Sequence, residues 1–337
     1  MAIDVEAPLR VVAVGGGTGL AALLRALKPN TVRENNPWRL TGIVAVSDNG
    51  GSSGRLREEL GIIPPGDLRN CLSALGLKGS ILGDLLDYRF KGDGALAGHS
   101  LGNLMLSAMA DLCGSWVAAI RQLSSVLVTA GRLYPATLTQ MTLCAEDAAG
   151  NKFEGETSIA RCNPPLKKLW LEPLDAEPVP EAILAILNAD VVILAPGSLY
   201  TSTIPNLLFP EIRAAIARSG APVAYVANIM AESGECSGLN LADHIDAIQS
   251  FGQIKLSAVL ANETPLSPDV LERYLMEGGA QLFADEDLPD NIHGGVPIIS
   301  RPLLDTEALL ARHHPELLND AIRELLIVLC PSLNQNE

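Results

Sequence analysis

Residues able to bind a phosphate group are concentrated in three glycine- and hydroxyl-rich segments of the chain. The first segment follows the four apolar residues Val11–Val14, and a leucine pattern with helical spacing begins after it at Leu20. A short apolar run is typical of a parallel strand that is buried on both faces. Glycines between a strand and a helix let a ligand approach the backbone, and the helix N-terminus presents N–H groups to an anion. We therefore expect a phosphate to bind at Gly15, Gly16, Gly17, Thr18 and Gly19.

This segment differs from the two common nucleotide-binding motifs. Leu20 stands where the dinucleotide fingerprint has its third glycine, and no Gly-Lys-Ser/Thr ending is present, which excludes a P-loop. Asp48 lies 31 positions after Gly17, whereas the ribose-binding acid of a dinucleotide fold is expected about 20 residues on. An ordinary NAD site is therefore not favoured, and a tight strand–helix turn without a ligand is the alternative.

The other two segments also follow apolar runs. Ser47–Gly54 follows Leu40–Val46, and Pro196–Ser202 follows Ala189–Ala195. Because the ends of parallel strands meet at one edge of a sheet, the three segments should lie close together. Backbone amides and hydroxyls of this kind solvate phosphates and sugar hydroxyls. We expect further ligand contacts from Asn49, Gly50, Gly51, Ser52, Gly197, Ser198, Tyr200, Thr201 and Ser202, although Tyr200 could equally be a core residue.

Asp48 and Asp67 are the candidate metal ligands and the candidate catalytic residues. Carboxylates beside a phosphate repel it unless a cation bridges them, and Mg²⁺ is commonly held by one or two carboxylates together with phosphate oxygens. The alternative is structural, with an Asx-turn at Asp48 and a helix cap at Asp67. Both interpretations remain open from the sequence.

Basic and amide side chains near these acids complete the candidate site. Arg55 and Arg69 could clamp an anion, although surface ion pairing is the commoner role of an arginine. Asn70 follows Arg69 directly. His99 could cap a helix, orient Asp48 or bind the ligand, and Asn103, four positions later, would share a helix face with it.

Composition excludes several classes of protein. The 337 residues are 48% hydrophobic, and their formal charge of −15 argues against binding to a nucleic-acid backbone. No apolar run reaches membrane length, and the first ten residues lack the order of a signal peptide, so we expect a cytoplasmic protein without a membrane span. The six cysteines form no C-x-x-C pair, which favours reduced, structural thiols.

The apolar runs alternate with helical patterns and so predict an α/β fold of the doubly wound, mostly parallel, Rossmann-like type. We also expect a strand at Leu123–Thr129. Two alternating runs, Ala136–Ala145 and Lys152–Ile159, predict a hairpin within a small antiparallel β insertion at about 130–172. A helix is expected from Pro205 to Arg218, a helix plus irregular chain at 265–302, and a closing amphipathic helix at Pro315–Leu329.

Five motifs in order resemble one known family, the YvcK branch of the YvcK/CofD family, whose members are named gluconeogenesis factors. The motifs are GGGTGL (15–20), SDNGGSSGRLR (47–57), PPGDLRNCL (64–72), GHSLGNL (98–104) and PGSLYTS (196–202). The resemblance covers about residues 10–330. It implies a single CofD-like α/β domain over 1–337, with an irregular β extension.

The resemblance also implies a function. The CofD branch transfers a 2-phospholactyl group from a guanosine-linked donor with Mg²⁺, whereas the YvcK branch binds UDP-sugars, notably UDP-N-acetylglucosamine, and supports cell shape and growth on gluconeogenic carbon sources. Asp48 and Asp67 match the metal-associated acids of the transferases. However, Asn49 replaces the second acid of a double acid, and Asp67-Leu68 is followed by Arg69-Asn70, so that an arginine stands in place of the last acid of the transferase motif Pro-Asp-Leu-Asp. We therefore expect a nucleotide-sugar-binding regulator that forms a homodimer, with Mg²⁺ as the candidate cofactor. The alternative is a Mg²⁺-dependent transferase of a phosphorylated group that uses the same pocket.

Overall fold

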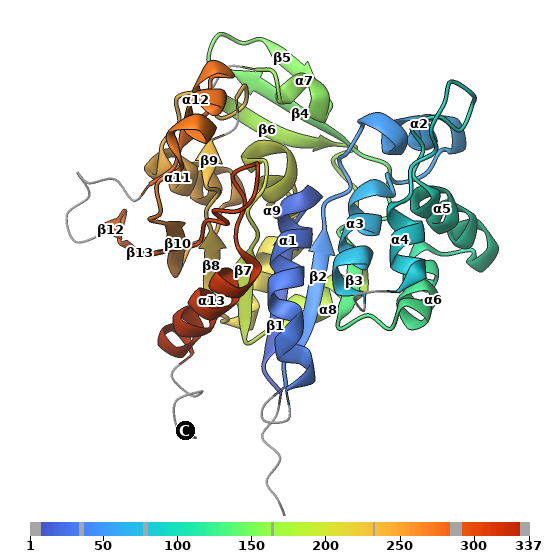
Figure 1. Cartoon of the computed structure of the whole chain (residues 1–337), viewed down its shortest axis with the longest axis horizontal. Helices are drawn as coiled ribbons and strands as arrows, with labels where there is room; N and C mark the ends of the chain where they lie inside the picture. Colours follow the sequence, from blue (N-terminus) through green and yellow to red (C-terminus); the bar gives the residue numbers. More distant parts are fainter. Residues whose placement is uncertain are drawn as a thin grey trace, which may run out of the picture.

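An eight-stranded sheet forms the centre of the protein in the computed structural model, which describes residues 8–33, 37–76, 80–162, 165–231, 233–283 and 292–330 (Figure 1). Neighbouring strands are parallel except for the antiparallel pair at one edge. The spatial order is β12 (Ile292–His293), β13 (Val296–Arg301), β10 (Ala258–Asn262), β8 (Val223–Val226), β7 (Val191–Leu194), β1 (Arg10–Gly15), β2 (Arg39–Val44) and β3 (Arg132–Pro135).

The strand order makes this sheet doubly wound. From β1 the chain proceeds outward through β2 and β3, and then returns to add β7, β8, β10 and β13 on the other side of β1. The direction of winding therefore reverses between β1 and β7. In open sheets of this kind, ligands bind outside the carboxyl ends of the strands at that switch point.

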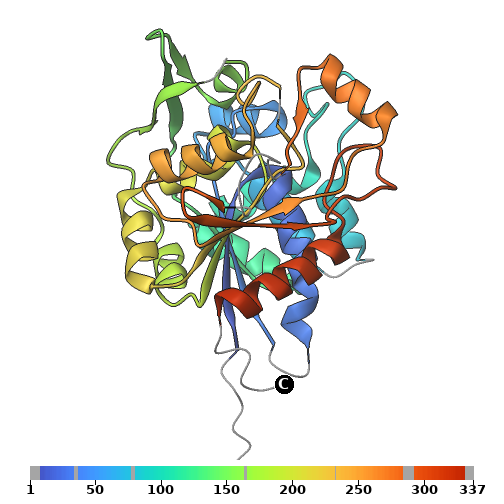
Figure 2. The same cartoon turned by 90° about the vertical axis from the view of Figure 1, so that its left-hand side faces the viewer.

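Helices cover both faces of the sheet, as the sequence predicts. One face carries α1 (Gly17–Leu27), α3 (Gly66–Leu75) and α13 (Pro315–Leu329), which lie in front of the sheet in Figure 1. Figure 2 shows α13 crossing beside α1. The other face carries α8 (Pro180–Leu187), α9 (Ile204–Leu207), α10 (Pro210–Ser219) and α11 (Leu241–Gly252). Apolar strands such as Val11–Val14 are fully buried between these two layers.

The strand expected at Leu123–Thr129 is wrong, because this segment ends helix α6 (Trp116–Leu127). Ser115 caps the helix by accepting a hydrogen bond from the backbone N–H of Ala118. The buried residues of α6 then recur at helical spacing, and this stripe outweighs the β-branched run near its end. The remaining helices are α2 (Gly51–Leu60), α4 (Ile81–Asp87), α5 (Leu101–Cys113), α7 (Glu156–Ile159) and α12 (Pro268–Met276).

A separate three-stranded antiparallel sheet lies above the carboxyl edge of the main sheet in Figure 1. It consists of β4 (Thr142–Asp147), β5 (Lys152–Glu154) and β6 (Leu166–Glu172). The expected hairpin is confirmed as the antiparallel pair β4 and β5. Its strands are shorter than predicted, because residues 136–141 precede β4 and Glu156–Ile159 forms helix α7. The insertion begins at Thr142 rather than at 130, because β3 pairs in parallel with β2 and belongs to the main sheet.

Two further segments differ from the sequence prediction. The helix expected over Pro205–Arg218 is divided into α9 and α10, and a π-helical turn at Leu199–Thr203 precedes α9. The segment 265–302 contains α12 as expected, but its last part forms the parallel strand β13. A two-stranded sheet joins β9 (Met230–Ala231) to β11 (Ala280–Gln281). Within the described part of the chain, no helix is long and apolar enough to span a bilayer.

Candidate functional site

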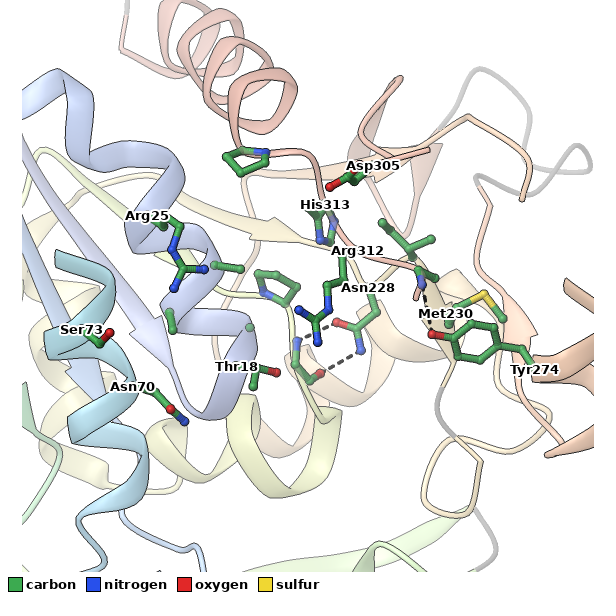
Figure 3. A pocket seen from close by; sticks show the side chains of 18 of the residues that line it. Thr18, Arg25, Asn70, Ser73, Asn228, Met230, Tyr274, Asp305, Arg312 and His313 are labelled. Atoms are coloured by element: carbon green, nitrogen blue, oxygen red, sulfur yellow. Dashed lines mark hydrogen bonds between the residues drawn. The ribbon is translucent and has the colours of Figure 1, made fainter. Parts of the chain in front are cut away.

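A pocket of about 500 Å³ opens at the switch point between β1 and β7 (Figure 3). Its walls come from α1, α3, the loops after β7 and β8, α12 and the segment before α13. The volume is in the range of small-molecule sites. The lining residues are Thr18, Gly19, Ala21, Ala22, Arg25, Asn70, Ser73, Asp87, Pro196, Gly197, Asn228, Ile229, Met230, Tyr274, Asp305, Ala311, Arg312, His313 and Pro315.

Gly19, in the first turn of α1, allows the chain after β1 to approach the loop after β7 closely at the pocket. A Cβ atom at this position would lie 1.8 Å from the carbonyl oxygen of Pro196 and 2.5 Å from its carbon. Both contacts involve backbone, which a side-chain rotation cannot relieve. Gly19 is therefore required where α1 packs against the loop after β7, and the pocket depends on that close approach.

The N-terminus of α1 already has an anion beside it, the carboxylate of Asp67. Gly16 is the N-cap of α1, and Gly17, at φ +57°, donates its backbone N–H to Asp67 Oδ2 at 2.6 Å. Thr18 and Gly19 come next in this first turn, where the helix offers its own amides no acceptor, and both line the pocket. The predicted phosphate-binding segment therefore has two parts. Gly17 is bonded to Asp67 of the protein itself, whereas Thr18 and Gly19 face the pocket.

Asp67 and Asp48 form a carboxylate pair behind this turn. Burial and, second to it, the charge of Asp48 raise the pKa of Asp67 to about 7, against the opposing effects of the Gly17 hydrogen bond and the Arg69 charge. Asp67 lies in the first turn of α3 but makes no capping hydrogen bond to that helix. Asp48 Oδ1 accepts the backbone N–H of Gly50 at 2.8 Å, as in the expected Asx-turn.

Two neighbouring carboxylates have the charge and the oxygen donors that Mg²⁺ prefers. A cation would offset the Asp48 charge, which after burial is the second cause of the raised Asp67 pKa, so Asp48 and Asp67 fit a divalent cation chemically. They are only two, since the described residues contain no group of three or more His, Cys, Asp or Glu side chains that could hold a metal. The remaining ligands would have to come from phosphate oxygens or water.

Asn228 fixes the loop after β7 on the pocket wall. Its Oδ1 accepts the backbone N–H of Gly197 at 2.7 Å, and its Nδ2 donates to the Gly197 carbonyl at 2.8 Å, as Figure 3 shows. The sequence analysis did not select Asn228 as a site residue. The signal was available, because Asn228 directly follows an apolar strand, as the residues of the other strand-end loops do.

Two arginines point toward the centre of the pocket in Figure 3, Arg25 from α1 and Arg312 from the segment before α13. Both are exposed. Opposite them lies the half-buried ring of Tyr274, whose hydroxyl accepts the backbone N–H of Ala311 at 3.1 Å. The sequence analysis did not select these three residues, because the segments that carry them contain no glycine-rich or otherwise distinctive motif.

His313 is a neutral member of the same wall. Burial lowers its pKa to about 4, against the opposing effect of its hydrogen bond to the Ala227 carbonyl at 3.1 Å. A carbonyl can only accept, so Nε2 carries the proton and Nδ1 is an acceptor. The imidazole therefore adds no positive charge to the pocket at neutral pH.

Ser52, His99 and Asn103 form a buried cluster outside the pocket lining. Ser52 Oγ accepts from Asn103 Nδ2 at 3.1 Å and from the backbone N–H of Ser100 at 3.4 Å, so its own proton is directed to His99 Nδ1 at 3.0 Å. Each of the three named side chains is at most 6% exposed. Burial and the charge of Arg55 lower the pKa of His99. The cluster joins α2 to α5.

The other residues selected around Asp48 contact the protein itself. Asn49 Oδ1 accepts the backbone N–H and the hydroxyl of Thr157, at 3.2 and 3.0 Å, which ties the loop to the small sheet. Gly51 begins helix α2. Arg55 donates to the Ala97 carbonyl at 2.8 Å on the protein surface. The structure therefore places these residues beside the pocket rather than in its lining.

Arg69 and Asn70 are adjacent in α3 but occupy different environments. Asn70 lines the pocket, whereas Arg69 is buried behind it and donates to Asp87 Oδ1 and Asn70 Oδ1. Burial lowers the pKa of Arg69, and the charge of Asp87 opposes this shift. Arg69 thus supports two pocket residues instead of facing the pocket directly.

The loop after β7 contributes Gly197 to the pocket lining, while the residues after it lie in a buried π-helical turn. The Ser198 carbonyl accepts the backbone N–H groups of Ser202 and Thr203. Tyr200 is a core residue, with its ring edge-to-face against Phe251 at 5.7 Å, and burial raises its phenol pKa. Thr201 and Ser202 accept hydrogen bonds through their carbonyls, from Ser47 Oγ and Asn206 Nδ2.

These features define an α/β protein with a ligand-sized pocket at the switch point of a doubly wound sheet. The family described as 2-phospho-L-lactate transferase CofD matches residues 11–304, so the chain belongs to the CofD family. The resemblance based on the five motifs is confirmed.

Relatives agree over nearly the whole chain. The gluconeogenesis factor of Halalkalibacterium halodurans is 39% identical over 93% of this chain and 95% of its own length. That of Bacillus subtilis is 36% identical over 94% of this chain and 98% of its own length. A crystal structure of a protein from Bacillus halodurans has a TM-score of 0.87 at 38% identity, covering 94% of this chain and 100% of that one.

Proposed function

We propose that this protein binds a nucleotide sugar of the UDP-N-acetylglucosamine type in the switch-point pocket and acts as a regulator that links carbon metabolism to cell-wall synthesis and cell shape. The observation that carries the proposal is the juxtaposition of the first turn of α1 with Arg312 across one pocket. Relatives named gluconeogenesis factor support the regulatory role.

A diphosphate fits the middle of the pocket. The amides of Thr18 and Gly19 lie at the positive end of the α1 dipole, and Arg25 and Arg312 point toward the same space (Figure 3). The pocket lining also contains Asp87 and Asp305, so the two exposed arginines supply positive charge to the space they point toward without making the whole pocket basic. Arginine is well suited to phosphate because its planar fork bonds two oxygens at once.

A nucleobase fits the end of the pocket formed by Tyr274, Met230 and Ile229. In Figure 3 Tyr274 and Met230 lie at the opposite side of the pocket from Asn70 and Ser73. An aromatic ring beside apolar side chains is a stacking surface for a planar base. Phosphate groups in the middle of the pocket would then connect the base to the part of the ligand that lies at the α3 end, beside Asn70 and Ser73.

The second candidate function is a Mg²⁺-dependent transfer of a phosphorylated group, and the neighbouring carboxylates of Asp48 and Asp67 favour it. In that case the two acids would hold the cation, which would neutralise charge on a diphosphate. The Thr18 and Gly19 amides would orient the same phosphates.

One experiment separates these functions. UDP-N-acetylglucosamine is titrated into the protein calorimetrically, with Mg²⁺ and with EDTA, and the mixture is then analysed by mass spectrometry. We expect saturable binding and recovery of the unchanged nucleotide sugar. Recovery of a new phosphorylated compound only in the presence of Mg²⁺ would favour the transferase. The absence of any binding would overturn the proposed function.

A further inference from the structure

We propose that the α3–α4 end of the pocket, formed by Asn70, Ser73 and Asp87, is a subsite for the hydroxyl groups of a sugar ring. This inference rests on the proposed function, because it assigns the sugar part of a nucleotide sugar to one end of the same pocket. It also assigns a positioning role to Arg69, which lies outside the pocket lining.

Arg69 organises this end of the pocket from behind. Its side chain is 7% exposed, and its guanidinium donates from Nη1 to Asp87 Oδ1 and from Nη2 to Asn70 Oδ1. The stem of Arg69 also packs against Gly102 of α5, where a Cβ atom would lie 2.8 Å from Arg69 Cγ and Cδ. Arg69 therefore holds one carboxylate and one amide in fixed orientations.

Asp87 presents hydrogen-bond acceptors to the pocket. Its second oxygen, Oδ2, accepts the hydroxyl of Ser73 at 2.8 Å, so both carboxylate oxygens are anchored by the protein. The side chain is nevertheless 56% exposed, and each carboxylate oxygen can accept more than one hydrogen bond. A ligand can therefore donate to Asp87 without breaking its contacts with Arg69 and Ser73.

Asn70 and Arg25 present donors to the same space. Because Asn70 Oδ1 is held by Arg69, the amide hydrogens on Nδ2 are the part of this side chain that remains for a ligand. Arg25 reaches the pocket from α1, as Figure 3 shows. Acceptors and donors thus lie side by side on one wall.

This combination fits a sugar better than another anion. A hydroxyl group donates one hydrogen bond and accepts others, and a sugar ring carries several hydroxyls on neighbouring carbons. A further phosphate would be repelled by the Asp87 carboxylate, whereas a sugar hydroxyl would donate to it.

The test compares two probes, UDP-N-acetylglucosamine and UDP, in calorimetric titrations of the full chain. In Asp87→Asn, we expect the affinity for UDP-N-acetylglucosamine to fall about tenfold, the usual size of the loss of a hydrogen bond to a charged group. The affinity for UDP should stay within about twofold of the wild type, because UDP lacks the sugar that contacts Asp87. The ratio of the two affinities is the readout, and a general disturbance of the fold would not change it selectively.

Two further variants complete the test. Asp84→Asn is the matched control, because Asp84 is an exposed acid of the same helix that does not line the pocket, and it should change neither affinity. Arg69→Lys keeps the positive charge but loses the fork that holds Asp87 and Asn70, so it should lower the affinity ratio as Asp87→Asn does.

The outcomes distinguish this inference from the proposed function. A wild-type protein that binds UDP, with the same affinity ratio in wild type and Asp87→Asn, would overturn the sugar subsite and leave nucleotide binding standing. A wild-type protein that binds neither probe would overturn both. A selective loss of UDP-N-acetylglucosamine affinity in Asp87→Asn and Arg69→Lys, but not in Asp84→Asn, would support the subsite.

Discussion

The switch-point pocket and the buried cluster of Ser52, His99 and Asn103 consist of similar residue types in opposite environments. In the pocket, Arg312 is exposed and Asp87 retains 56% of its side-chain surface. In the cluster, every hydrogen bond of Ser52 goes to another part of the protein. Polar residues in this part of the protein therefore serve two purposes. Some face a ligand, and others hold the loops that make the ligand site.

The largest expected effect comes from Gly19→Ala, because it acts where the two strand-end loops touch. The added methyl group would lie 1.8 Å from the Pro196 carbonyl oxygen, so backbone must move. Overpacking typically costs about 1–3 kcal/mol, and a backbone clash should reach at least the upper end, about 3 kcal/mol. Urea denaturation should show this loss, and calorimetry should show no binding of UDP-N-acetylglucosamine.

Gly83→Ala is the matched control for that prediction. Gly83 lies in α4, and no atom lies within 4 Å of the position of its Cβ. Alanine is the better helix former, so the free energy of unfolding should rise by up to about 1 kcal/mol. Equal stabilities of Gly19→Ala and the wild type would contradict the close approach of α1 to the loop after β7.

Asp67→Asn tests the acid that links α3 to the first turn of α1 through the backbone N–H of Gly17. The folded-state pKa of Asp67, about 7, lies above the value of 3.8 for the unfolded chain, so the folded state holds this proton more tightly. Wild-type stability should therefore fall as pH rises from about 4 to 7, and the full cost is present above pH 7. Asparagine can still accept the Gly17 N–H, but it does not ionise.

We expect Asp67→Asn to gain about 2 kcal/mol relative to the wild type between pH 5 and pH 8, measured by urea denaturation at both values. Asp111→Asn, at an exposed position of α5, should show no such trend. A difference between wild type and Asp67→Asn that does not change with pH would contradict the buried, protonatable state of Asp67.

Arg312→Ala tests the pocket alone. Arg312 is exposed, so its removal should leave the free energy of unfolding within about 0.5 kcal/mol of the wild type. The affinity for UDP-N-acetylglucosamine should fall about tenfold or more, because a charge-assisted bond to phosphate is lost. Arg121→Ala, at an exposed position of α6, is the control, and an equal affinity in both variants would place the diphosphate elsewhere.

Much of the fold could be predicted because strands that are buried on both faces have a clear apolar pattern. Val11–Val14 lies within β1, and the closing helix was predicted with its observed bounds, Pro315–Leu329. Leu123–Thr129 was misassigned because a β-branched run concealed the helical stripe of α6. Strand β13 was not predicted because it contains Pro297 and is only partly buried, so its apolar pattern is weak.

The candidate site could be predicted as a region but not side chain by side chain. Topology brings the ends of β1 and β7 together, and the sequence located both ends correctly. Which groups face the pocket depends on local geometry, because Asn70 of α3 lines the pocket whereas its neighbour Arg69 is buried behind it. Arg312 and Tyr274 reach the pocket from segments that are distant in the sequence. The residue pattern around each of them does not show that the fold brings it to the pocket.

The smallest effect is expected for Ser52→Ala, which sharpens the comparison between the two regions. Removing Oγ leaves Asn103 Nδ2 and His99 Nδ1 without their partner in a buried site, so urea denaturation should show a loss of about 1 kcal/mol. The affinity for UDP-N-acetylglucosamine should stay within about twofold, since Ser52 does not line the pocket. Ser125→Ala, at an exposed position of α6, controls for the loss of a hydroxyl as such. A tenfold loss of affinity at unchanged stability would instead mean that Ser52 contacts the ligand. Ser52 would then belong to the pocket and not to the buried cluster that supports it.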